Sequence, residues 1–357
     1  MADRPNLFSY ATKELSQDAF ICWLIDWAGV SQCNGPEDEA LRQCGRGFVD
    51  ALFAKWEDWE GYDVDLGDKI FVEIHQQEKN IDVLVRVDKR YVLLIEDKTG
   101  SGAHGNQLED YWYTVVQGET TLGKVNQDDL FPIYLKTGNH SIVEADRIGE
   151  REEYKVFNRG DFLEVLGTYS GNNQILLDYR QYLQSLEDRT NSYENWTTAS
   201  GRDDPLARQG LYGLLEKRFL GPRSRKGKID WNYVQNRQFG GFTGVYWRPS
   251  EVSKEAGLWF QEDTDGKIEL VFRLHVPNKQ WQRARLRNWH AAIISVGGGS
   301  VAKPARLVSG EYMTVAIWAT DAVAFGEDGK FDSNGTVQNL RKAEKVLKEA
   351  SRRLTTH

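Results

Sequence analysis

Apolar positions recur at helical spacing in the first part of the chain. The stretch LSQDAFICWLIDWA repeats apolar side chains about every 3.6 residues, which predicts a mostly buried helix over residues 15–28. A second helix is predicted over residues 37–59, where Phe48, Leu52 and Trp56 share one face. The chain is therefore expected to begin with two helices.

The period of the apolar pattern then changes from about 3.6 to two. Three successive strands are predicted, over residues 69–79, 80–87 and 91–98. The triplet Asp88-Lys89-Arg90 is the expected turn between the last two strands. A helix over residues 107–117 follows, with Asn106 as its cap and Glu109 completing a capping box. Two further strands are predicted, over residues 129–138 and 154–158, and two further helices, over residues 161–166 and 174–186. This order is typical of an α/β core whose mixed central sheet is flanked by helices.

A polar, turn-rich stretch at residues 190–205 predicts a domain border. It divides the chain into a first domain of residues 1–190 and a second of residues 191–357. Beyond the border, short helices alternate with apolar strands such as FTGVYW and IELVFRLHV, and the chain ends in a basic amphipathic helix. This pattern predicts a C-terminal α+β domain that binds substrate or a partner.

Composition narrows the class of protein. A length of 357 residues with 40% hydrophobic residues is enough for one large or two ordinary folded domains. The sequence contains no apolar run of about 18 residues and no signal-peptide pattern, so we expect neither a membrane span nor export. An odd count of three cysteines suits a reducing cytoplasm. A net charge of −8 argues against a nucleic-acid coat protein but allows an acidic metal site with a local basic patch.

Two acidic residues and one lysine converge on the predicted hairpin. A turn centred on Lys89 places Asp82 opposite Glu96, with Cβ atoms about 4.5–5.5 Å apart. Lys98 lies two residues further and therefore on the same face as Glu96. The ordinary alternative is a surface ion pair, but both strands are apolar on both faces, as is normal for buried strands.

Such a cluster predicts a divalent-cation site. Two adjacent carboxylates raise each other's pKa, and a divalent cation relieves that conflict. Mg²⁺ (or Mn²⁺) prefers hard oxygen ligands, lowers the pKa of bound water and offsets charge on a phosphoryl oxygen. Lys98 would orient the attacking water or neutralise the transition state.

The glycines after the third strand offer a competing interpretation. Residues 100–105 match G-x-G-x-x-G, the fingerprint of a dinucleotide-binding oxidoreductase. The strand before them ends in charged residues, however, and Glu109 and Asp110 in the next helix would repel a pyrophosphate. We therefore treat the oxidoreductase as a remote alternative.

The charged residues carry a resemblance to a known superfamily. Asp82, a spacer of thirteen residues and then Glu96-Asp97-Lys98 resemble the PD-(D/E)xK nucleases, although Ile81 replaces the proline. Gln107 and Tyr111 match the Q-x-x-x-Y motif of the RecB-like branch. The chain is most similar to an uncharacterised bacterial family of this superfamily, often found near defence systems.

The resemblance implies a restriction-endonuclease-like fold and a Mg²⁺-dependent deoxyribonuclease that leaves a 5′-phosphate, in a role such as antiviral defence. It implies that Asp82 and Glu96 bind the metal with the Asp97 carbonyl and Glu14, for which Asp18 is the second choice. It further implies that Gln107 and Tyr111 position the phosphate or Lys98.

Substrate contact is predicted in the second half of the chain. The stretch KRFLGPRSRKGK is basic, and we expect it to bind DNA phosphates through Lys217, Arg218, Arg223, Arg225, Lys226 and Lys228. A second basic stretch, KQWQRARLRNW, interleaves Trp281 and Trp289 with its cations, and tryptophan stacks on unpaired bases.

Two questions stay open from the sequence. The substrate is expected to be DNA, with RNA as an alternative. An unrestrained nuclease would harm its host, so we expect a trigger or a regulatory protein partner; a homo-oligomer is the alternative. The rival function from another class is a catalytically silent, nuclease-fold subunit that binds nucleic acid within a larger complex.

Overall fold

The computed structural model describes residues 5–100, 102, 106–151, 153–199, 202–220, 229–234, 242–249, 251–262 and 268–355. Contacts divide the chain into two compact units. The N-terminal unit comprises Met1–His140 and Glu144–Asp188, and the C-terminal unit comprises Ser141–Val143 and Arg189–His357. Within the described ranges, every helix is too short or too polar to cross a lipid bilayer.

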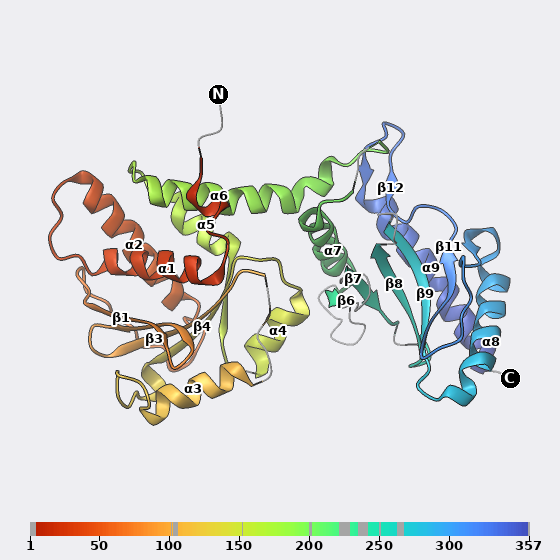
Figure 1. Ribbon diagram of the computed structural model, residues 1–357, viewed down its shortest axis with the longest axis horizontal. Helices are drawn as coiled ribbons and strands as arrows, with labels where there is room; N and C mark the ends of the chain where they lie inside the picture. The colour runs from red at the N-terminus through yellow and green to blue at the C-terminus, as the bar shows by residue number, and fades with distance from the viewer. Residues whose placement is uncertain are drawn as a thin grey trace. The chain divides into compact units, whose positions relative to one another are not determined.

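The described strands of the N-terminal unit form one five-stranded mixed sheet (Figure 1). In spatial order they are β1 (Val72–Glu78), β2 (Ile81–Val87), β3 (Tyr91–Lys98), β4 (Leu130–Lys136) and β5 (Lys155–Asn158). The first three strands are antiparallel, whereas β4 is parallel to both β3 and β5. This arrangement confirms the predicted α/β core with a mixed central sheet.

Helices cover both faces of this sheet (Figure 1). One face packs against α1 (Glu14–Ala28), α2 (Pro36–Ala54), α5 (Arg159–Gly167) and α6 (Gln174–Asn191). The other packs against α3 (Gln107–Gln117) and α4 (Ile142–Arg151). Because side chains alternate along a strand, Leu93 and Ile95 of β3 join the first core, whereas Val92 and Leu94 join the second.

The β2–β3 hairpin has the predicted register. Val83 pairs with Ile95 and Val87 pairs with Tyr91, so the next residue along each strand brings Asp82 towards Glu96. Asp88 and Lys89 in the connecting turn both have positive φ, which lets so short a loop reverse the chain. The turn was predicted from the same three residues.

Two local predictions were wrong. The second helix ends at Ala54, five residues before the predicted end. Asn106 precedes α3 but makes no side-chain capping bond, because its backbone (φ −101°, ψ 19°) is outside the extended region that an N-cap adopts. A capping box is instead present at α5, where Asn158 and Asp161 bond each other's backbone N–H groups.

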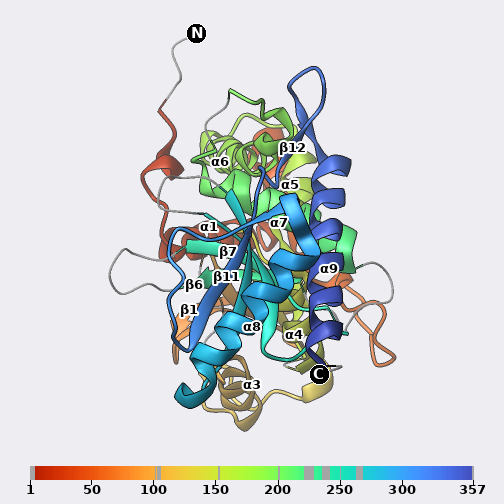
Figure 2. The same ribbon diagram turned by 90° about the vertical axis from the view of Figure 1, so that its right-hand side faces the viewer.

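The C-terminal unit contains an antiparallel sheet, which agrees with the predicted α+β class. Its strands, in spatial order, are β10 (Val301–Ala302), β11 (Tyr312–Trp318), β9 (Ile268–His275), β8 (Ala256–Glu262), β7 (Phe242–Trp247) and β6 (Ile229–Val234). A short hairpin pairs β12 (Ala324–Phe325) with β13 (Phe331–Asp332). Helices α7 (Pro205–Leu220), α8 (Lys279–Gly297) and α9 (Ser333–Thr355) share one hydrophobic core with the sheet, and α8 and α9 lie side by side (Figure 2).

The close contact of α1 with α2 generates a test of the fold. A Cβ atom at Gly45 would lie 2.3 Å from the carbonyl oxygen of Leu24, whereas Gly47 on the same helix has open space. We expect Gly45→Ala to lower the free energy of unfolding by about 1–3 kcal/mol through overpacking. The matched control Gly47→Ala should keep or raise it, by up to about 1 kcal/mol, because alanine favours helix. Urea denaturation of the full chain measures both, and equal stabilities would contradict the packing described.

Candidate active site

Three consecutive charged residues end a strand that is buried along its whole length. Every residue of β3 is buried, including Glu96, Asp97 and Lys98. Alternation along the strand places Glu96 and Lys98 in the row of Val92 and Leu94, towards α3. Asp97 points the other way, towards α1. The end of β3 therefore presents ionisable side chains to the helices on both faces of the sheet.

Lys98 is the centre of the cluster on the α3 side. Its Nζ forms a close ion pair with Glu96 Oε1 and donates a hydrogen bond to the Asp97 carbonyl oxygen at 2.9 Å. The same nitrogen lies 3.7 Å from Asp82 Oδ2 and 4.0 Å from Glu14 Oε2. The structure thus brings together Asp82, Glu96, Lys98 and Glu14, which the sequence predicted as site residues.

Helix α3 adds two polar groups to this cluster. Gln107 Nε2 donates hydrogen bonds of 2.8 Å to Glu96 Oε1 and to the hydroxyl of Tyr111. Residues four apart lie on one helical face, so Gln107 and Tyr111 both face the end of β3. The first turn of the helix fixes the position of the Glu96 carboxylate.

Burial changes the protonation of these groups. Desolvation, followed by the charge of Asp82, raises the pKa of Glu96 to about 8, although Lys98 opposes the shift. Desolvation alone would lower the pKa of Lys98, but its hydrogen bond with Glu96 and the charges of Glu96, Asp82 and Glu14 raise it. Lys98 is therefore a cation at neutral pH, and Glu96 ionises only when the pH rises or another cation arrives.

A buried hydrogen-bond network holds Asp97 on the α1 side. Gln17 of α1 donates from Nε2 to Asp97 Oδ1, and its Oε1 accepts hydrogen bonds from Thr137 (2.7 Å) and Tyr179 (2.9 Å). Sequence reasoning missed Gln17. Gln17 lies three residues after Glu14 and therefore on the same helical face, and this spacing alone could have indicated that it approaches the site.

Gln77 connects this side to the cluster around Lys98. Its Nε2 donates to Asp18 Oδ2 at 2.9 Å and to Asp82 Oδ1 at 3.0 Å. Gln77 has φ 55°, an uncommon backbone conformation for a residue other than glycine. Desolvation and the charge of Asp82 raise the pKa of Asp18 to about 6, and burial with the charge of Asp18 raises that of Asp97. Asp18 is thus linked to Asp82 through Gln77, whereas Glu14 is within 4.0 Å of Lys98.

The donor atoms fit a hard divalent cation. Glu96 Oε2 is buried and has no hydrogen-bond partner among the residues that the structure describes, and Asp82 and the Asp97 carbonyl supply further oxygens around Lys98. Among the described residues, no three side chains of His, Cys, Asp or Glu converge as a metal-binding group. Mg²⁺ usually takes one or two protein carboxylates and completes its shell with water and phosphate oxygens, so this set suffices.

The predicted basic residues lie in the C-terminal unit and are described only in part. Lys217 and Arg218 are exposed in the last turn of α7. Arg218 donates a hydrogen bond of 2.8 Å to Asn334 and lines a cavity of about 510 Å³ together with Gln338 and Arg341. Four members of the predicted set lie outside the described residues: Arg223, Arg225, Lys226 and Lys228. Trp289, the second tryptophan of the other basic stretch, is buried in the core and cannot stack on a base.

The Gln17 network generates a test of how the end of β3 is held. Gln17→Leu would leave Asp97, Thr137 and Tyr179 without their shared partner in the interior, and we expect the free energy of unfolding to fall by about 1–3 kcal/mol. Gln184→Leu is the matched control, because Gln184 is exposed on α6 and its side chain bonds Asp188 four residues on. Urea denaturation should separate the two variants, and equal stability would show that the network contributes nothing.

Comparison with known proteins agrees with this geometry. The family model described as PD-(D/E)XK nuclease superfamily matches residues 5–200, which is more than half of the chain. Searches of curated proteins and of solved structures returned no match. Members of this superfamily are generally nucleases that use divalent metal ions, although some are inactive. The matched range contains the whole five-stranded sheet and the cluster around Lys98, and the chain belongs to the PD-(D/E)XK nuclease superfamily.

Proposed function

We propose that this protein is a metal-dependent nuclease that hydrolyses phosphodiester bonds of DNA. One observation carries the proposal: the Lys98 ammonium pairs with Glu96 and lies 3.7 Å from Asp82, at the end of a buried strand. Burying three charged residues in succession is costly for folding. Two carboxylates beside one ammonium can hold a divalent cation and neutralise charge on a phosphate, which is what phosphodiester hydrolysis needs.

Each residue has a proposed role in the reaction. Asp82, Glu96 and the Asp97 carbonyl would hold Mg²⁺ or Mn²⁺, and Glu14 would support it from α1. When bound, the cation supplies a Lewis acid that lowers the pKa of water and offsets phosphoryl charge. Lys98 would orient the attacking water and neutralise charge that develops on the phosphate as the bond to the 3′-oxygen breaks. Gln107 and Tyr111 would hold Glu96 and the phosphate in place.

The C-terminal domain, residues 191–357, is proposed to contact the substrate. Arg218 and Arg341 line one cavity, and the exposed Lys217 precedes Arg218 in α7, so two cations meet at this cavity within a chain of net charge −8. Lysine and arginine release counterions from nucleic-acid phosphates, and this contribution does not depend on base sequence. A role in bacterial defence and control by a protein partner or by homo-oligomerisation are further parts of the proposal.

A second candidate is a catalytically silent subunit that binds nucleic acid. It is favoured by the position of Lys98 Nζ, which contacts Glu96 Oε1 and the Asp97 carbonyl oxygen, because the latter is an oxygen that the metal would use. In an active enzyme the ammonium must move aside when the metal binds. Incubating the purified chain with DNA in Mg²⁺ and in EDTA separates the two functions, because a silent subunit cleaves under neither condition.

Substitutions at the cluster test the proposal. We expect Asp82→Ala or Lys98→Ala to reduce Mg²⁺-dependent DNA cleavage by at least about 100-fold, because each removes a group that acts on the phosphate or its metal. Lys89→Ala is the control: Lys89 is exposed in the turn at the far end of the same hairpin, so cleavage should be unchanged. Wild-type-like cleavage by either cluster variant would refute the assignment, provided that circular dichroism shows both to be folded.

The raised pKa of Glu96 predicts a pH dependence. Below about pH 8 the Glu96 carboxyl is largely neutral and therefore a poor metal ligand. Its ionised fraction rises by up to about tenfold per pH unit below pH 8 and levels off above pH 8. Cleavage at limiting Mg²⁺ should therefore increase from pH 6 to pH 8 and then reach a plateau. Raising the Mg²⁺ concentration should shift the profile to lower pH, and a flat profile across this range would contradict the role of Glu96.

A further inference from the structure

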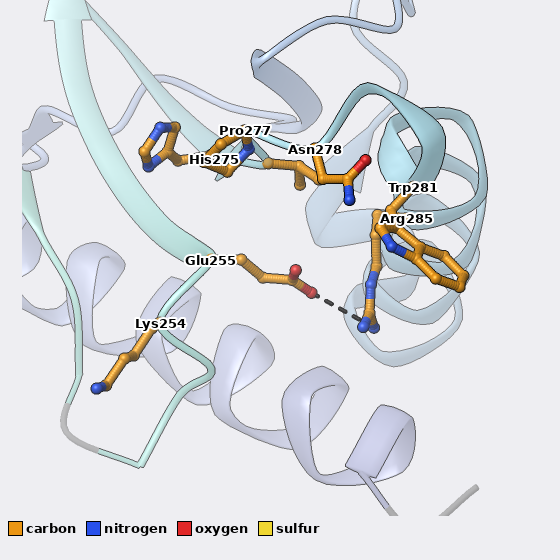
Figure 3. A pocket seen from close by; sticks show the side chains of 8 residues that line it. Lys254, Glu255, His275, Pro277, Asn278, Trp281 and Arg285 are labelled. Atoms are coloured by element: carbon orange, nitrogen blue, oxygen red, sulfur yellow. Dashed lines mark ion pairs between the residues drawn. The ribbon is translucent and has the colours of Figure 1, made fainter.

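A cavity of about 430 Å³ in the C-terminal unit shares no lining residue with the cavity around Arg218. It lies between the end of β9 and the first turns of α8, beside the start of β8. Figure 3 shows Trp281 and Arg285 next to each other, with His275 and Asn278 along another side and Glu255 pointing towards Arg285. Its volume is within the range of small-molecule sites.

The cavity offers flat aromatic surfaces to solvent. Trp281 is 55% exposed, whereas Trp289 on the same helix is 1% exposed and packs in the core. The His275 ring stacks on Tyr312 with centroids 4.5 Å apart and an interplanar angle of 9°, and Tyr312 is itself 62% exposed. A single exposed aromatic is ordinary, but an exposed indole and an exposed ring stack near one cavity indicate that a planar ligand stacks there.

The charges around the cavity suit a ligand that joins a planar ring to a phosphate. Arg285 lines it as a cation, and helix α8 contains no acidic residue along its length. Glu255 is fixed inside by a 2.8 Å hydrogen bond from Trp289 Nε1 and by Arg285 at 3.6 Å. The carboxylate can therefore accept a hydrogen bond from a ring N–H without bringing an unpaired charge into the site.

We propose that this cavity binds one unpaired nucleotide of a single-stranded nucleic acid. The base would stack on Trp281, its edge would donate to Glu255, and its phosphate would lie against Arg285. A duplex would not fit, because both faces of each paired base are covered by neighbouring bases, whereas a single strand exposes them. The choice of nucleic acid as ligand rests on the proposed nuclease function, but the site itself does not use the cluster around Lys98.

Fluorescence anisotropy measures binding of the full chain to a labelled oligonucleotide of about 12 thymidines. The buffer contains EDTA, which prevents metal-dependent cleavage of the probe. We expect Trp281→Ala to weaken binding by about 5- to 100-fold and Trp281→Phe to restore part of it, because phenylalanine keeps a stacking face. Arg285→Gln should weaken binding more than Arg283→Gln, a control that removes the same charge from the same helix outside the cavity.

Competition identifies the source of the nucleotide. Unlabelled single strands of DNA or RNA should displace the probe, whereas a duplex of equal length should compete at least about tenfold less well, and so should thymidine monophosphate. The proposal is overturned if Trp281→Ala binds like the wild type, if Arg283→Gln and Arg285→Gln are equally weak, or if only the free nucleotide binds. Failure of the nuclease proposal would be seen separately, as absent Mg²⁺-dependent cleavage by the wild-type chain.

Discussion

The close contact between the Lys98 ammonium and the buried Glu96 carboxyl is the constraint on which the proposed site depends. Burial costs an ammonium several kcal/mol of hydration, and it holds the neighbouring carboxyl neutral until a cation binds; good geometry and further hydrogen bonds must offset the cost. Gln107 and the Asp97 carbonyl provide those bonds. Asp82 and Glu14 add negative charge beyond what one lysine neutralises, and this excess is what a divalent cation would compensate.

Because side chains alternate along β3, its charged residues contact helices on both faces of the sheet. Glu96 and Lys98 face α3, where Gln107 and Tyr111 approach them. Asp97 faces α1, where Gln17 holds it from the opposite side. The strand end is therefore fixed from both faces, and a rigid support of this kind keeps catalytic groups within the narrow range of positions that catalysis tolerates.

The sequence was most informative where apolar residues are periodic. Strands β2 and β3, the turn between them and helix α3 were predicted closely, because a one-residue slip in register would move every apolar side chain to the wrong face. The register alone then brought Asp82, Glu96 and Lys98 together. Local propensity was less reliable: Asn106 has the right residue type for a cap, but its backbone conformation prevents the bond.

Contacts between distant segments could not be predicted. Gln17 meets Thr137 and Tyr179, which are more than a hundred residues away in sequence, and no periodic pattern encodes that meeting. Gln77 bonds both Asp18 and Asp82 from a backbone of positive φ, and glutamine carries no sequence signal for that conformation. The exposed position of Trp281 and the buried position of Trp289 depend likewise on how α8 packs against the C-terminal sheet.

Calorimetric titration of the full chain with Mg²⁺ at neutral pH tests the central claim most directly, because it needs no knowledge of the substrate. Measured in two buffers with different heats of protonation, the binding heat reports how many protons leave as the ion binds. The account predicts saturable binding with release of about one proton per ion, as the neutral Glu96 carboxyl ionises to become a ligand. The absence of binding, or binding without proton release, would contradict it.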